Sequence, residues 1–177
     1  MGFMTPNRIS FRTGACLAAM AVGAASALSI GSPVLAATAT APMAVTATVQ
    51  SACIVAATPL AFGSYDPTSG SPKDGTSIIT VTCTSGTSFT VGLNAGGTSG
   101  ATVTTRQMVN GSNRLNYALY SDANHSINWG NTAGNDTPAA TIATALPSQL
   151  TVYGRVGASQ NVPAGLYTDS VTVTVNY

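Results

Sequence analysis

The 177-residue chain is poor in charge, with six Lys and Arg, five Asp and Glu and one His, for a formal net charge of +1. Such a balance lacks the basic footprint of a nucleic-acid-binding protein. Thr, Ser, Gly, Ala and Val dominate the sequence, a composition that favours strands and turns over helices.

The first 36 residues have the pattern of an export signal. Arg8 and Arg12 precede an Ala-rich apolar stretch over residues 15–30, and small residues follow, ending at Ala36. This order predicts a signal peptide over residues 1–36, cut after Ala36 or one residue later. A transmembrane anchor is the alternative, but a span usually needs about 20 strongly apolar residues, and this stretch is mostly Ala and Gly.

The remaining residues 37–177 number 177 − 36 = 141, enough for one domain with a core of its own. Its four Lys and Arg against five Asp give a net charge of 4 − 5 = −1. Only Cys53 and Cys83 remain after processing, and exported proteins meet oxidising conditions. We expect the two to form a disulfide; two free thiols are the alternative.

Apolar residues in several short segments alternate with polar ones, as a half-buried strand requires. The segments predict strands around residues 79–83, 89–93, 103–109, 114–120, 150–156 and 167–177. Asn110-Gly111 predicts a tight hairpin turn, and Pro163-Ala164-Gly165 another turn. The expected fold is all-β, an immunoglobulin-like antiparallel β-sandwich, with an up-and-down barrel as the alternative.

The start of the mature chain has an unusually long alternating run over residues 37–49. Seven apolar positions at period two exceed the usual strand of about 5 to 6 residues. An extended peptide of this kind can add to an exposed sheet edge of another protein. The run is a candidate donor strand; a frayed tail is the alternative. The candidate donor positions are Ala41, Met43, Val45, Ala47 and Val49.

The cleanest strand pattern lies at the other end, over residues 170–177. A sandwich with this strand last is either complete or lacks one further strand, and an uncovered apolar edge requires a partner to cover it. The candidate edge of an acceptor groove is Val171, Val173, Val175 and Tyr177.

Several short motifs resemble one family in the family's own order. They are Ser51-Ala52-Cys53, Leu60-Ala61-Phe62-Gly63, Ile79-Thr80-Val81-Thr82-Cys83, Arg106-Gln107-Met108, Leu115-Asn116-Tyr117, Ile127-Asn128-Trp129-Gly130 and Pro163-Ala164-Gly165-Leu166-Tyr167. Together they are similar to the spore coat U domain, which is also the subunit domain of archaic chaperone-usher pili. The resemblance covers nearly all of residues 37–177.

The resemblance implies an incomplete immunoglobulin-like domain. Such a domain is held at its last strand by a periplasmic chaperone and polymerised through an outer-membrane usher. Each subunit's amino-terminal segment then completes its neighbour, a role that residues 37–49 would fill. Most donor side chains here are Ala and smaller than deep pockets favour, which leaves the register of the donor strand open.

Residues with the usual signatures of catalysis are sparse. His125, with Asp122 nearby, is the one histidine, and no G-x-S-x-G elbow accompanies it. One His and two paired cysteines fall short of a zinc site, and no Lys-Ser/Thr follows the glycine-rich residues 92–100. We expect no catalytic residues, no metal and no cofactor, and Trp129 in the core instead of on a sugar-binding platform.

The first functional hypothesis is a structural subunit of a surface pilus that supports adhesion and biofilm formation. Its expected partners are identical or related pilin subunits, a periplasmic chaperone and an outer-membrane usher, and its expected location is the cell surface, reached through the periplasm. A tip adhesin of the same fibre and a coat protein of dormant cells are alternatives. A small hydrolase around His125 is the weakest hypothesis.

Overall fold

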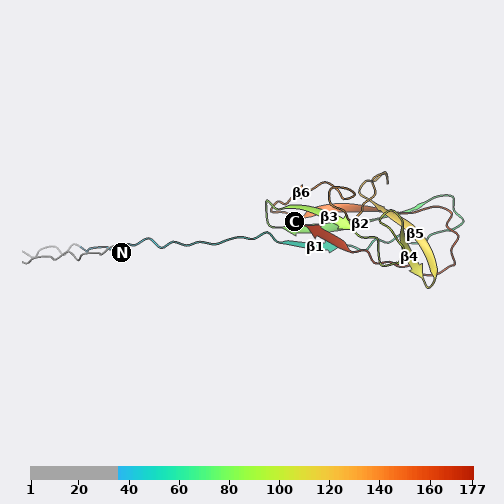
Figure 1. The fold of residues 1–177 in the computed structure, drawn as a ribbon, viewed down its shortest axis with the longest axis horizontal. Helices are drawn as coiled ribbons and strands as arrows, with labels where there is room; N and C mark the ends of the chain where they lie inside the picture. Colours follow the sequence, from blue (N-terminus) through green and yellow to red (C-terminus); the bar gives the residue numbers. More distant parts are fainter. Residues whose placement is uncertain (1–35) are drawn as a thin grey trace, which may run out of the picture. The chain divides into compact units, whose positions relative to one another are not determined.

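The computed structural model describes residues 36–177, and these contain β-strands and no helix (Figure 1). The predicted signal peptide therefore lies, apart from Ala36, outside the described residues. The chain divides into two units after Val45. In the first unit, residues 36–45 have no regular secondary structure and are exposed. The second unit, Thr46–Tyr177, carries all of the strands described below.

Five antiparallel strands form the larger sheet of the second unit. In spatial order they are β1 (Cys53–Ala57), β2 (Lys73–Cys83), β7 (Ser148–Val156), β5 (Asn113–Tyr120) and β4 (Arg106–Asn110). The smaller sheet has the order β6 (Thr141–Ile142), β3 (Ser88–Leu93) and β8 (Val173–Asn176). The predicted all-β fold is confirmed. Because β1 and β8 are sheet edges, the sheets do not close into the alternative up-and-down barrel.

The core lies between the two sheets and consists of the residues whose alternation the sequence showed. Their side chains are at most 7% exposed. They are Ile79 and Val81 on β2, Phe89, Val91 and Leu93 on β3, Leu115, Tyr117 and Leu119 on β5, and Val152 and Val156 on β7. Trp129 is also in the core, as expected: it is 1% exposed, and its Nε1 donates to the carbonyl of Val91 at 2.8 Å.

The hairpin between β4 and β5 is present, but its turn lies one residue later than predicted. Asn110 pairs with Asn113, so Gly111 and Ser112 are the two loop residues. Gly111 has φ 59°, whereas Asn110 is not in the left-handed region. A positive φ at the first loop position is typical of a type II′ turn, where glycine is the usual residue. The glycine, and not the asparagine, is what this turn requires.

The last strand is shorter than the sequence pattern predicts. Only β8, Val173–Asn176, pairs with β3, and the residues before it make a single bridge from Thr168 to Val109 of β4. Strand β3 ends at Leu93, opposite Val173, so residues 167–172 have no ladder to join. Alternation alone shows which face a residue takes, but not whether a neighbouring strand is there to pair with it.

Candidate functional site

The edges of the two sheets leave an unpaired gap between β1 and β8. Strand β1 pairs only with β2, and β8 pairs only with β3. The two edge strands run near one another (Figure 1). No backbone pairing joins them within the part of the chain that the structure describes. Each edge therefore presents free N–H and C=O groups to the space between them.

Side chains that face the core at these edges are uncovered. Val55 of β1 lies directly opposite Val81 of β2, so both point to the same face, yet Val81 is 1% exposed and Val55 is 42% exposed. Val173 and Val175 of β8 are half-buried, although their direct partners include the fully buried Leu93 and Val91. Val55 stays exposed and Val173 and Val175 stay only half-buried because no strand covers them between β1 and β8.

Two adjoining hollows continue this gap beyond the end of β1 and the start of β8. The first, of about 390 Å³, lies between residues 57–60 and residues 167–173, with Ile79, Leu93 and Val152 on its floor. The second, of about 720 Å³, lies between residues 60–67 and residues 162–167. Both are lined by Leu60, Phe62, Met108 and Tyr167. We call the gap between β1 and β8 with these two hollows the open groove.

One wall of the open groove is held from inside by Asp169. Its carboxylate accepts hydrogen bonds from the hydroxyl of Tyr117 at 2.7 Å and from the backbone N–H of Gly97 at 2.9 Å. A Cβ on Gly96, which has φ 90°, would lie 2.1 Å from the same carboxylate, so only glycine fits there. Burial and the bond to Asp169 raise the pKa of Tyr117, which keeps the phenol protonated as the donor. These contacts, with the bridge from Thr168 to Val109 of β4, hold residues 167–172 in place.

Arg106 fixes the adjoining edge of the larger sheet. It is 0% exposed and donates to four backbone carbonyls, those of Leu93, Asn94, Val103 and Trp129, at 2.6 to 2.9 Å. Burial lowers the pKa of its guanidinium, while the negative charges of Asp169 and Asp136 oppose that shift. The side chain ties β4 to the end of β3, beside the open groove. Arg106 was not among the predicted core residues.

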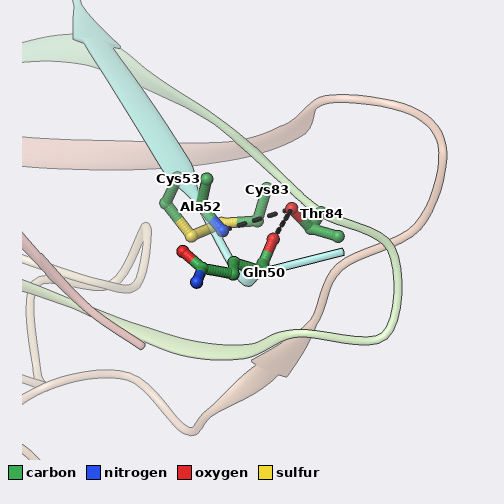
Figure 2. The surroundings of a disulfide bond; sticks show 5 residues. All are labelled: Gln50, Ala52, Cys53, Cys83 and Thr84. Carbon is green, nitrogen blue, oxygen red and sulfur yellow. Dashed lines mark hydrogen bonds between the residues drawn. A yellow bond between two sulfur atoms is a disulfide. The ribbon is translucent and has the colours of Figure 1, made fainter. Parts of the chain in front are cut away.

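The predicted disulfide between Cys53 and Cys83 is confirmed and joins two residues that are direct partners on β1 and β2 (Figure 2). Thr84 reinforces it: its Oγ1 accepts from the N–H of Ala52 and donates to the carbonyl of Gln50, both at 3.2 Å. The bridge closes a loop with a sequence separation of 30, which stabilises the fold by roughly 3 to 4 kcal/mol in the chain-entropy model. These contacts fix where the amino-terminal segment leaves the domain.

The candidate donor positions all lie in exposed chain without regular structure. Met43 is 83% exposed, Val45 80% and Val49 81%, and Ala41 and Ala47 are exposed as well. Their role as a donor strand stays a prediction.

The four candidate acceptor residues lie in three different places: the first hollow, strand β8 and the exposed residue after it. Val171 and Val173 line the first hollow, Val175 lies within β8 opposite Val91, and Tyr177 follows β8 and is 63% exposed. The structure thus brings Val171, Val173 and Val175 to the groove, together with the β1 side, which was not predicted. Their role as an acceptor edge stays a prediction.

His125 does not form a pair with Asp122. The Asp122 carboxylate accepts from the backbone N–H groups of Ser126 and Ile127, which also lowers its pKa. The His125 side chain is 7% exposed, and its Nε2 lies 3.8 Å from Asp74. The carboxylate of Asp74 accepts hydrogen bonds from both Nε and Nη2 of Arg155 at 2.7 Å.

Among residues 36–177, no group of three His, Cys, Asp or Glu side chains could hold a metal ion. The same residues include no helix of the length and apolarity that a membrane span needs.

A family model described as the Spore Coat Protein U domain matches residues 39–174. The chain belongs to the Spore Coat Protein U domain family. One relative in this comparison is "Protein U" of Myxococcus xanthus, which is 38% identical over 175 residues, covering 90% of this chain and 97% of that protein. The predicted resemblance to this family is confirmed.

The chain is also similar in fold to a solved structure. It is similar to a chain in the complex of the CsuC chaperone with the CsuE tip adhesion subunit from the archaic chaperone-usher Csu pili of Acinetobacter baumannii, with a TM-score of 0.53 and 23% identity. The match covers 73% of this chain and 40% of that one. This similarity is one of fold, and it agrees with the immunoglobulin-like sandwich expected from the sequence.

Proposed function

We propose that this protein is a structural subunit of a surface pilus and that its open groove accepts the amino-terminal segment of another subunit. The observation that carries the proposal is the uncovered strip of core-facing side chains between β1 and β8, above all Val55 and Val173. Apolar side chains exposed in such a row need a cover, and one extended strand has the right shape to pair with both free edges.

Residues 37–49 suit this role by their pattern and their freedom. The odd-numbered positions are all apolar, so one face would enter the groove while Thr38, Thr40, Thr46 and Thr48 face outward, together with the exceptions Pro42 and Ala44. In the described structure the segment forms no strand of its own domain and is exposed. A segment left free in its own subunit can pair with the next one, and repeating that step builds a fibre.

The partners and location follow from the same proposal. Before assembly, an open groove needs a temporary cover, and a periplasmic chaperone would supply it; the solved relative is itself a chaperone–subunit complex. Export through the periplasm, passage through an outer-membrane usher and display at the cell surface then lead to adhesion and biofilm formation by a multivalent fibre. The protein acts by assembly and not as an enzyme.

A tip subunit is the second candidate, because the solved relative's complex contains a tip adhesion subunit. A shaft subunit both accepts and donates a strand, whereas a tip subunit only accepts one. A coat protein of dormant cells is a further candidate that the family description suggests. Electron microscopy of producing cells distinguishes a fibre from a coat.

Deletion of residues 37–49 tests the proposal. The intact mature chain should give a ladder of oligomers on a denaturing gel when it is not boiled, because a strand buried in a neighbour dissociates slowly. The deletion should remove the ladder, and boiling should collapse it to monomer. A matched control replaces residues 37–49 with Gly and Ser at the same length. Monomer in the intact chain, soluble without any chaperone, would refute the donor strand.

A further inference from the structure

The domain has two distinct ends, and both expose large apolar side chains. The disulfide end consists of Cys53, Cys83 and residues 84–87 and 142–147. Ile142 is 60% exposed there and Leu146 is 75% exposed. They lie at this end because β6 pairs with the start of β3, and because Ser148, the first residue of β7, pairs with Val81.

The far end consists of residues 110–113 and 157–166. It lies opposite because β7 ends at Val156, whose partner is Lys73 at the start of β2. Leu166 is 81% exposed there, in the bend after Gly165. The side chain of Asn110 lies against this bend and leaves no room for a Cβ at Gly165. Leu166 also lines the second hollow of the open groove.

The donor segment leaves the domain at the disulfide end, and the connection between the last donor position and the domain is short. Gln50 and Ala52 are held by Thr84, and only residues 50–52 separate Val49, the last donor position, from Cys53. An extended chain covers at most about 14 Å over the four steps from Val49 to Cys53. Two subunits joined by this segment must therefore nearly touch where it passes from one to the other.

Fibre growth determines at which end of the neighbour's groove the donor strand must leave. If the strand left the neighbour's groove at the disulfide end, two identical ends would face each other and would compete for space with the neighbour's own departing segment. Unlimited growth needs a heterologous contact, in which two different surfaces meet. The strand must therefore leave the neighbour's groove at the far end. This places it antiparallel to β8, which runs from the far end to the disulfide end.

We propose that the disulfide end of each subunit packs end-on against the far end of the subunit that accepts its strand, with Ile142 and Leu146 facing Leu166. The inference rests on the proposed strand exchange and adds a second contact to it. Burial of these large aliphatic side chains removes apolar surface from water and so stabilises the contact. The end contact would limit the angle between neighbouring subunits, which a flexible strand connection alone does not.

Cross-linking in the assembled fibre tests this contact. A chain with both Leu146→Cys and Leu166→Cys, treated with a short thiol-to-thiol linker, should give a ladder that survives boiling. Each single variant should give none, because position 146 meets position 166 and not itself. A matched control pairs Ile127→Cys with Leu166→Cys; Ile127 is 60% exposed but lies in the loop after β5, away from both ends. That pair should also give no boiling-resistant ladder.

A charge exchange provides an independent readout. Leu146→Lys and Leu166→Asp should each lower the temperature at which the unboiled ladder dissociates, and the two changes together should restore much of the loss. An intact unboiled ladder with no cross-links and no charge coupling would overturn the end contact and leave strand exchange standing. If the unmodified chain gave no ladder without boiling, the proposed function would be overturned, and the end contact with it.

Discussion

Arg106→Ala is expected to lower the free energy of unfolding by about 3 to 5 kcal/mol, because it removes the one donor group shared by four buried carbonyls. An unsatisfied buried carbonyl costs about 1 to 3 kcal/mol, and the lost volume adds a cavity. Total stability is only about 5 to 15 kcal/mol for a typical domain, so the variant should lose a large part of its stability and unfold at a clearly lower denaturant concentration. Denaturant titration of the mature chain without residues 37–49, with the disulfide intact, measures this loss.

Arg114 of β5 provides the matched control. It is exposed, and its contacts to the carbonyls of Gly111 and Asn113 are long, at 3.4 and 3.5 Å. Arg114→Ala should change the free energy of unfolding by less than about 0.5 kcal/mol. An Arg106→Ala protein as stable as the Arg114→Ala protein would show that the buried guanidinium does not hold β4 to the end of β3.

Mixing two assembly-deficient variants should give dimers and nothing larger. The first variant carries both Met43→Asp and Val45→Asp and is the donor-deficient chain. Its donor segment loses two apolar side chains, each of which stabilises by about 1.5 to 3 kcal/mol when buried, and gains two charges that the groove cannot pair. Each 1.4 kcal/mol is a factor of ten in affinity, so donation should weaken by at least about 100-fold. In Val171→Asp, the charge lies in the first hollow and blocks acceptance instead.

Each variant alone should stay monomeric, because one cannot donate and the other cannot accept. In the mixture, the intact donor of the Val171→Asp chain enters the intact groove of the donor-deficient chain, and growth stops there. Size-exclusion chromatography with light scattering measures the product. Long ladders from either variant alone would contradict the assignment of donor and groove. A cooperative unfolding transition in denaturant, like that of the unmodified chain, checks that the Val171→Asp chain is folded.

Alternation in the sequence was enough to predict the strands and the core. Positions such as Val81, Val91 and Leu119 keep one parity within their segments, and parity decides which face of a strand is buried. The disulfide was predictable because only two cysteines remain after the predicted export signal. Trp129 was placed correctly because a large aromatic side chain gains most from burial.

The groove could be predicted only in part. Val171 and Val173 were found from the alternation of the last strand, but Val55 on β1 depends on which strands pair, and that is a long-range property. Arg106 was missed because a charged residue is rarely buried without a carboxylate beside it. A signal was present nonetheless: Arg106 keeps the parity of Met108 and pairs with the buried Tyr117, so its side chain faces the core.

The most direct test of the central claim is to fill the groove with the segment itself. A synthetic peptide of residues 37–51 is added to the full mature chain carrying Met43→Asp and Val45→Asp, which has an open groove but no working donor. We expect one peptide per chain, a higher unfolding temperature and slower hydrogen exchange at β1 and β8. The same peptide with Met43→Asp and Val45→Asp should do none of this. Equal effects of the two peptides, or no binding by either, would contradict the proposal that the groove is completed by the amino-terminal segment of another subunit.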